Sequence, residues 1–285
     1  MSRAARTYTC DWPALRDVIS QVLVAPSTLN AGKRTVSSKL AQIHARCAAG
    51  EEWSTGGADT DTLGEWLDGG YTFPVLADDQ VPALPVDGIR AGWLFDMDGD
   101  LRIDRMHGGE CELFARRARR KCRTGLDVQV LLSVPACTDH ATVARFGAWA
   151  GMFCESLQSC GYDLGLSVGV ENGGLWTNAR GVTANLVQVS RLGERFFARD
   201  WAFLFSPAGY RVGMFVAKCL PDLIPDQLRG DSPDGLGQLA AGLGRPVVRD
   251  GIEWDPADRV LRIEWGGGEF DPLEYQQRLD GLTID

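Results

Sequence analysis

Val128-Gln-Val-Leu-Leu-Ser-Val134 is a nearly continuous apolar run, and Leu164-Gly-Leu-Ser-Val-Gly-Val170 is a second one. Apolar runs of this length are typical of strands that are buried on both faces. Between them, apolar residues recur at the spacing of a helix with one buried face: Val143, Phe146, Ala150, Phe153 and Leu157. Thr138 or Asp139 can cap this helix, and Gly161 can end it. The order strand, helix, strand predicts a βαβ unit with two parallel strands.

The residues that follow this unit predict the rest of a mixed sheet. Residues 184–189 predict a third strand, and residues 251–265 alternate as a hairpin around Asp255-Pro-Ala-Asp. Further helices are predicted at residues 201–205, 206–219 and 273–279. We therefore predict an α/β fold with a parallel βαβ core, in which a von Willebrand A-like or a Rossmann-like layering would both fit.

The first 50 residues are predicted to form a helical extension. Apolar residues at helical spacing predict one helix around Ile19 and another around Leu40, with a break at residues 26–32. Residues 51–62 are rich in Gly, Thr and Asp and are predicted to be a linker. The chain is thus divided into an extension, residues 1–50, and an α/β domain, residues 51–285.

Composition limits the classes of function. The 285 residues are 45% hydrophobic, which is sufficient for a large core, and the net charge of −9 works against non-specific attraction to nucleic acid or anionic membranes. No apolar run approaches the roughly 20 residues of a membrane helix, and no apolar segment follows the first basic residues. We expect a cytoplasmic protein with no membrane partner.

The eight cysteines are expected to be reduced thiols. They form no CxxC pair, and they have no paired spacing with the three histidines, His44, His107 and His140, that a zinc site would need. Most lie in apolar stretches, where a thiol behaves as a small hydrophobic group.

An acidic motif, Phe95-Asp-Met-Asp-Gly-Asp-Leu, is a candidate for chemistry. Asp98-Gly99 between two strand-like runs predicts a tight hairpin turn. Asp96, Asp98 and Asp100 alternate around it, and their carboxylates could hold Mg²⁺ or Ca²⁺. The motif also resembles the first motif of the haloacid dehalogenase superfamily, which implies Asp96 as a nucleophile and Asp98 as an acid/base. Asp100 replaces the usual threonine, so the hairpin is the preferred interpretation.

A basic cluster follows within residues 112–123, which are predicted to form a helix. Its members are Arg116, Arg117, Arg119, Arg120, Lys121 and Arg123. The cluster fits either a solvated helix face or a contact surface for phosphates or for an acidic partner.

Two other patterns in the sequence do not predict a hydrolase triad or a dinucleotide site. Ser133, Asp139 and His140 are types found in hydrolase triads, but Ser133 has no Gly-x-Ser-x-Gly elbow. The glycines after residue 164 do not form the GxGxxG pattern of a dinucleotide site.

From about residue 53 to residue 219, the chain resembles an uncharacterised family of tailed-bacteriophage proteins. The likeness rests on the Trp/Gly-rich opening (53–70), the Asp-x-x-Gly-Asp turn (96–100), the Gly-Glu-Cys-Glu segment (109–112), the strand–helix–strand block (128–170) and the Trp-Ala-Phe and Pro-Ala helices (201–208). It implies a phage or prophage setting. The βαβ block also resembles von Willebrand A-type domains, which grip partners through a metal.

The expected function is that of a non-enzymatic phage binding or assembly protein that contacts a protein or nucleic acid in the host cytoplasm. Two alternatives stay open. One is a magnesium-dependent enzyme that acts on phosphate esters through Asp96 and Asp98, and the other is a structural protein of the virion.

Overall fold

The computed structural model describes twelve stretches of the chain: residues 6–29, 34–83, 93–101, 114–117, 125–133, 139–159, 162–172, 183–192, 194, 197–214, 216–217 and 250–282. Everything below refers to these residues.

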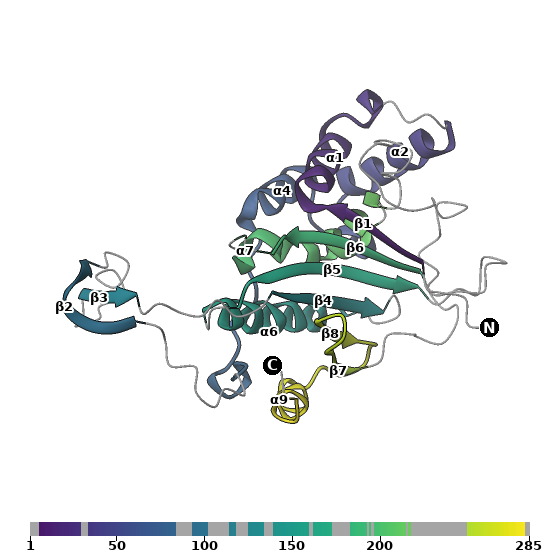
Figure 1. The fold of residues 1–285 in the computed structure, drawn as a ribbon. Helices are drawn as coiled ribbons and strands as arrows, with labels where there is room; N and C mark the ends of the chain where they lie inside the picture. The colour runs from purple at the N-terminus through teal and green to yellow at the C-terminus, as the bar shows by residue number, and fades with distance from the viewer. Residues whose placement is uncertain are drawn as a thin grey trace.

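The centre of the molecule is a six-stranded mixed sheet (Figure 1). In spatial order it consists of β1 (Arg6–Asp11), β6 (Thr183–Ser190), β5 (Leu164–Asn172), β4 (Leu126–Ser133), β8 (Val260–Trp265) and β7 (Gly251–Asp255). β4 is parallel to both β5 and β8, and β1 is parallel to β6. β6 runs antiparallel to β5, and β7 runs antiparallel to β8. The predicted α/β fold with a mixed sheet is confirmed.

The predicted βαβ unit is also confirmed. β4 and β5 pair in parallel from Leu126 opposite Leu164 to Ser133 opposite Glu171. The helix α6 (His140–Ser159) connects them. The predicted hairpin is present as β7 and β8, and α9 (Pro272–Asp280) is the predicted closing helix.

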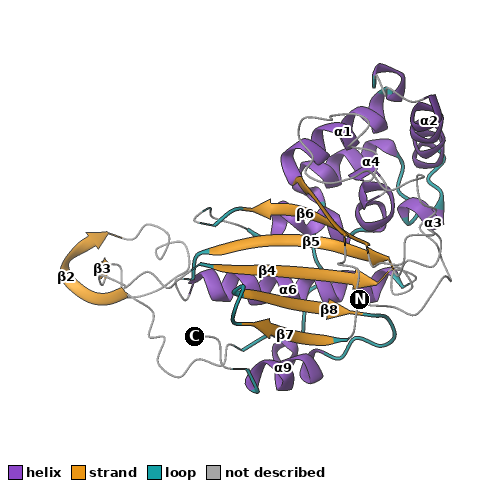
Figure 2. Cartoon of the chain, turned by 45° about the vertical axis from the view of Figure 1, so that its right-hand side comes forward, coloured by secondary structure: helices purple, strands orange, loops and turns teal. Residues whose placement is uncertain are grey.

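The described helices cover one face of the sheet (Figure 2). Along β4, Leu126, Val128, Val130 and Leu132 are buried, while Asp127 between them is exposed. The buried face packs against α6, α1 (Trp12–Val24), α7 (Ala198–Trp201) and the 3₁₀ turn η5 (Ala202–Phe205). This alternation is the period-two pattern of a strand with one face towards the core.

Large aromatic side chains fill the space between α6 and the sheet. Those with almost no exposed surface are Phe146, Trp149, Phe153, Trp201, Phe205, Trp265 and Phe270. Leu15, Ile19 and Leu40 from the N-terminal helices belong to the same continuous core. The N-terminal segment therefore shares one hydrophobic core with the rest of the described chain.

The N-terminal region has more structure than the sequence predicts. α1 and α2 (Arg34–Ala48) are the two predicted helices, with a short 3₁₀ turn η1 (Pro26–Thr28) after α1. The predicted linker is wrong, because α3 (Glu52–Thr55) and the start of α4 (Thr60–Glu65) occupy it. Polar residues build these helices: Thr55 donates to the Glu51 carbonyl, and Asp59 accepts from the Thr62 amide at 2.9 Å.

The chain then continues through the π-helical turn η2 (Trp66–Gly70), an extended stretch and the 3₁₀ turn η3 (Asp78–Gln80). Leu67 is buried, as a helix around residues 63–67 would require. Apart from η3, residues 71–83 form neither helix nor strand.

A second sheet contains only β2 (Trp93–Leu101) and β3 (Phe114–Arg117), which pair antiparallel. The predicted hairpin turn at Asp98-Gly99 is wrong, because β2 continues through it. Phe95 and Asp100 are both in register with Ala115, so the intervening residues form a bulge. A bulge accommodates Asp-Gly as readily as a turn does. The predicted basic helix is wrong over Phe114–Arg117, where pairing with β2 makes a strand.

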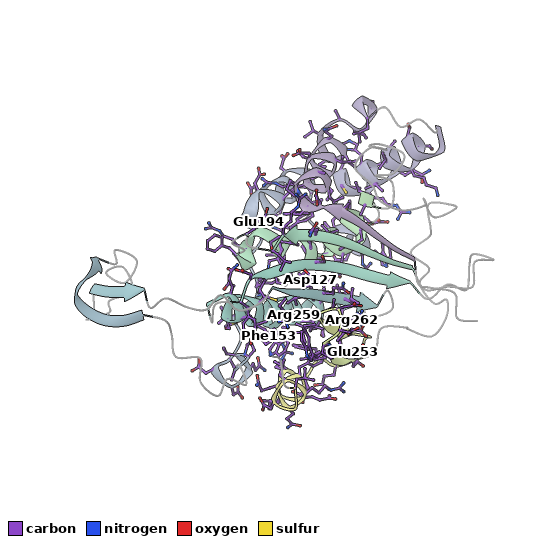
Figure 3. The ribbon with its side chains drawn as sticks, viewed as in Figure 1. Asp127, Phe153, Glu194, Glu253, Arg259 and Arg262 are labelled. Atoms are coloured by element: carbon purple, nitrogen blue, oxygen red, sulfur yellow. The ribbon has the colours of Figure 1, made fainter. Side chains whose placement is uncertain are left out.

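The sheet face opposite α6 carries charged side chains in neighbouring positions (Figure 3). Asp127 on β4 is exposed, and Arg262 on β8 forms an ion pair with Glu253 on β7 at 3.7 Å. Arg259, in the turn before β8, donates from Nε to the Gly125 carbonyl at 3.0 Å. Arg262 is thus paired with a carboxylate and Arg259 with the backbone, as expected for a solvated sheet face.

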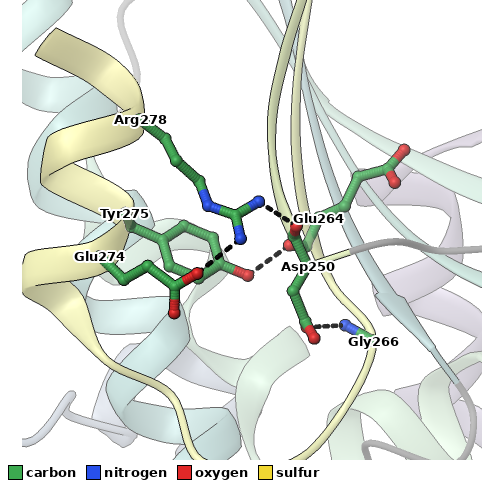
Figure 4. A network of polar contacts seen from close by, with 6 residues as sticks. All are labelled: Asp250, Glu264, Gly266, Glu274, Tyr275 and Arg278. Atoms are coloured by element: carbon green, nitrogen blue, oxygen red, sulfur yellow. Dashed lines mark hydrogen bonds and ion pairs between the residues drawn. The ribbon is translucent and has the colours of Figure 1, made fainter. Parts of the chain in front are cut away.

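A polar network attaches α9 to the β7–β8 hairpin (Figure 4). The Tyr275 hydroxyl donates to the Glu264 carbonyl, and the Arg278 guanidinium donates to the Asp250 carbonyl and to Glu274. The Asp250 carboxylate accepts from the Gly266 amide at 2.6 Å. Burial raises the pKa of Tyr275, so this hydroxyl is a structural donor.

Candidate functional site

The acidic motif lies in the two-stranded sheet. The backbone of Asp96, Asp98 and Asp100 runs within β2, but the positions of their side chains lie outside the described part of the structure. The predicted Mg²⁺ or Ca²⁺ site therefore stays a prediction. Among the described residues, no group of three His, Cys, Asp or Glu side chains is placed to hold a metal ion.

The basic cluster also lies only partly within the described residues. The backbone of Arg116 and Arg117 ends β3, and the positions of their side chains lie outside the described part of the structure. Arg119, Arg120, Lys121 and Arg123 lie outside the described residues. The partner contact predicted for the cluster stays untested.

The described cysteines are poor nucleophiles. Burial raises the pKa of Cys10 to about 12 and that of Cys47 to about 11, and it raises the pKa of Cys154 further. Because the thiolate is the reactive form, these three thiols are inert near neutral pH.

The most developed polar cluster lies where β4 leads into α6. We call it the His140 cluster, and its members are Glu52, Trp53, His140, Tyr210 and Arg211. In open α/β sheets, the carboxyl ends of parallel strands are the usual location of ligand sites. α6 is the next described element after β4 in the chain, and the cluster joins its first residue to α3 and to the π-helical turn η6 (Gly209–Gly213).

Asp139 positions His140 by capping α6. Its Oδ1 accepts a hydrogen bond from the Ala141 amide at 3.0 Å, and its other carboxylate oxygen accepts from the Thr142 hydroxyl. The hydrogen bond from Thr142 lowers the pKa of Asp139, which keeps the cap ionised. Asp139 thus faces the helix end, and it does not orient His140 as the acid of a hydrolase triad would.

His140 is held in its neutral form. Its Nδ1 forms a short hydrogen bond with the Tyr210 hydroxyl. Burial lowers the pKa of His140, and the neighbouring Arg211 cation lowers it further, while Glu52 and Asp139 oppose the shift. The imidazole is therefore uncharged at pH 7, and one of its two nitrogens is bonded to Tyr210.

Arg211 is a nearly buried cation, with only 6% of its surface exposed. Its Nη1 donates to the Trp53 carbonyl, and its Cζ atom lies 4.1 Å from the centre of the Trp53 ring. A guanidinium stacked on an indole gains cation–π attraction, and the gain is larger where water is excluded. Trp53 itself keeps 50% of its surface exposed.

A close contact between Gly56 and the ring of Pro207 keeps α3, which carries Trp53, in place. Gly56, at the end of α3, has a φ of 65°, and a Cβ at this position would lie 2.7 Å from Cγ of Pro207. A side chain other than hydrogen would both strain this backbone and push α3 away from the segment that carries Arg211. Trp53 is thus presented on a short helix that is fixed at both ends.

The sequence points to His140 but not to its partners. Tyr210 is 70 residues away from His140, and Trp53 is 158 residues away from Arg211. One signal for Arg211 is present in the sequence, since it is a charged residue in the otherwise apolar helical stretch after Pro207. A charged residue at a core position needs compensating partners, which makes Arg211 a candidate for a specific role.

Comparison of the chain with protein-family models, with curated protein sequences and with solved structures finds no match. Within the described ranges, no helix is long and apolar enough to cross a membrane.

Proposed function

We propose that this chain is a non-enzymatic binding protein that contacts a protein partner through Trp53, in a phage or prophage setting. The observation that carries the proposal is the half-exposed indole of Trp53, stacked on the buried guanidinium of Arg211. Tryptophan and arginine are enriched among the residues that dominate the binding energy of protein interfaces.

The surroundings of Trp53 make it a suitable anchor. Arg211 and the Gly56–Pro207 contact hold the indole before any partner arrives, so little conformational entropy remains to be lost on binding. Other large apolar side chains are exposed, but none of the described ones is stacked on a buried cation. A fixed and partly exposed indole fits an apolar pocket on another protein.

The charge around Trp53 favours a protein over a nucleic acid. Glu51 and Glu52 precede Trp53 directly, and the chain carries a net charge of −9. The Glu51 carboxylate is paired with Arg46 at 3.7 Å, but the exposed Glu52 beside the anchor would repel phosphates, and phosphate contacts supply a large part of nucleic-acid affinity. An apolar pocket rimmed by basic residues is the complementary surface.

The described reactive groups support binding over catalysis. His140 shares a hydrogen bond with Tyr210, and the described thiols have raised pKa values. The rival proposal, a magnesium-dependent enzyme acting on phosphate esters through Asp96 and Asp98, rests on side chains outside the described part. A structural role in the virion would use the same contact surface in a permanent assembly.

The test begins with purification of the tagged chain from cells in which its native replicon is active. The partner is identified by mass spectrometry and produced separately, and the dissociation constant is measured by calorimetry. Trp53→Ala should weaken binding by at least about 30-fold, the usual loss at an interface anchor. Val75→Ala is the control, because Val75 is 98% exposed and should leave the affinity unchanged.

Two results would overturn the proposal. One is an affinity that Trp53→Ala leaves unchanged. The other is magnesium-dependent hydrolysis of an aryl phosphate that disappears in Asp96→Asn, which would favour the enzyme.

A further inference from the structure

His140 contacts three separate elements at once. It is the first residue of α6, its Nδ1 is hydrogen bonded to Tyr210 on η6, and Glu52 on α3 is one of the charged groups that act on its ring. α3 contributes Trp53 to Arg211, which follows Tyr210 in the chain. One titratable ring therefore lies next to the contact between α3 and η6.

Protonation would disturb this arrangement in two ways. A neutral imidazole can accept the Tyr210 hydroxyl proton at one nitrogen and donate from the other, whereas a protonated imidazole donates from both. The Tyr210 hydroxyl would then have to turn its proton away. The second effect is electrostatic, because the new cation would lie beside the nearly buried Arg211.

The charged groups around the ring come from each of the packed elements. Arg211 on η6 opposes protonation, while Glu52 on α3 and Asp139 at the cap of α6 favour it. Arg211 and burial together outweigh the two carboxylates, since the pKa of His140 lies below its usual value of 6.5. The neutral ring is the form that fits the closed contact.

We propose that protonation of His140 weakens its contact with Tyr210 and Arg211 on η6, so that the position of Arg211 under the Trp53 ring, and with it the presentation of Trp53, depends on pH. The contact is complete above pH 6.5, and it weakens as the pH falls from 6.5 towards the lowered pKa of the folded protein. The proposal rests on contacts within the chain, and it holds whether or not Trp53 binds a partner.

The experiment uses ¹⁹F NMR of the purified full chain carrying 5-fluorotryptophan. Trp53→Phe identifies the resonance of Trp53, which is then followed from pH 8 to pH 5. We expect it to move or split below pH 6.5 in the wild-type protein and to stay constant in His140→Gln. His44→Gln is the matched control: His44 is also part-buried and bonded, to the Val22 carbonyl, but it lies on α2.

A second variant keeps the test decisive if His140→Gln does not fold. Tyr210→Phe retains the ring but removes the hydrogen bond that favours the neutral imidazole, so the midpoint for Trp53 should rise by about half to one pH unit. The proposal would be overturned if the Trp53 resonance of the wild-type protein did not change down to pH 5. It would also be overturned if this resonance titrated in His140→Gln and Tyr210→Phe as it does in the wild-type protein. Because no partner is present in the sample, either result is independent of the proposed function.

Discussion

Gly147 is the position at which the packing of α6 is tested most sharply. It lies in the middle of this helix, and a Cβ built on it would lie 2.4 Å from Cγ, 2.6 Å from Cδ1 and 2.8 Å from Cβ of Phe205. Phe205 has no exposed surface, and its ring packs edge-to-face on Trp201 with centroids 5.1 Å apart. The ring therefore has little freedom to move away from an added methyl group.

Two opposing effects set the magnitude for Gly147→Ala. Alanine is favoured over glycine inside a helix by about 1 kcal/mol. Overpacking of a filled core costs about 1–3 kcal/mol, and three contacts below 3 Å place this substitution at the upper end. We expect a net loss of about 1–2 kcal/mol in the free energy of unfolding.

The assay is urea denaturation followed by circular dichroism, in which a change of midpoint at constant slope reports stability. Gly64→Ala is the matched control: Gly64 also lies in a helix, α4, but nothing lies within 4 Å of its added Cβ, so this variant should gain up to about 1 kcal/mol. In a Phe205→Ala background, which removes the Cγ and Cδ1 atoms, Gly147→Ala should lose most of its penalty. A stabilised Gly147→Ala would refute the close approach of α6 to Phe205.

Three further predictions each concern a single contact. Gly56→Ala should destabilise the protein by about 1–3 kcal/mol in the same assay, because of its positive φ and the clash with Pro207, and a neutral result would contradict the docking of α3. Asp139→Ala should cost about 1 kcal/mol at pH 7 through loss of the α6 cap. Because the pKa of Asp139 is lowered, that difference from wild type should be present above its unfolded value near 3.8 and vanish as the pH falls below it; a difference that persists in acid would exclude the cap as its cause. Tyr275→Phe should cost about 1–3 kcal/mol by leaving the Glu264 carbonyl without its hydroxyl donor, and unchanged thermal unfolding would contradict the network at α9.

Local pattern predicted those elements whose periodicity is set by the core. β4 and β5 follow from their apolar runs, and α6 follows from the helical spacing of its apolar residues, because most of these residues are buried in the core. β1 was not predicted, since Arg-Thr-Tyr-Thr-Cys-Asp offers only Tyr8 and Cys10 as alternating apolar positions, and it forms a strand by pairing with β6. The predictions for β2 and β3 were wrong for a related reason. In β2, an Asp-Gly pair is compatible with a bulge as well as with a turn, and the four residues of β3 are too few to show a period.

In the candidate site, too, the sequence predicts local structure but not the contacts between distant segments. The sequence places His140 at the start of a helix, yet it gives no indication that Tyr210 and Trp53 meet there. Those contacts depend on how η6 and α3 pack around α6, and that packing is determined by the whole core. Arg211 was the one locally visible signal, as a charge within an apolar helical stretch.

The most direct test of the central claim is a hydrogen-exchange footprint of the purified complex between this chain and its partner at pH 7.5. Slower exchange at the amides of α3, Glu52–Thr55, is predicted on binding, and it should be absent when the same partner is added to Trp53→Ala. A stable complex in which the α3 amides exchange as fast as in the free protein would contradict the claim that Trp53 is the anchor of the contact.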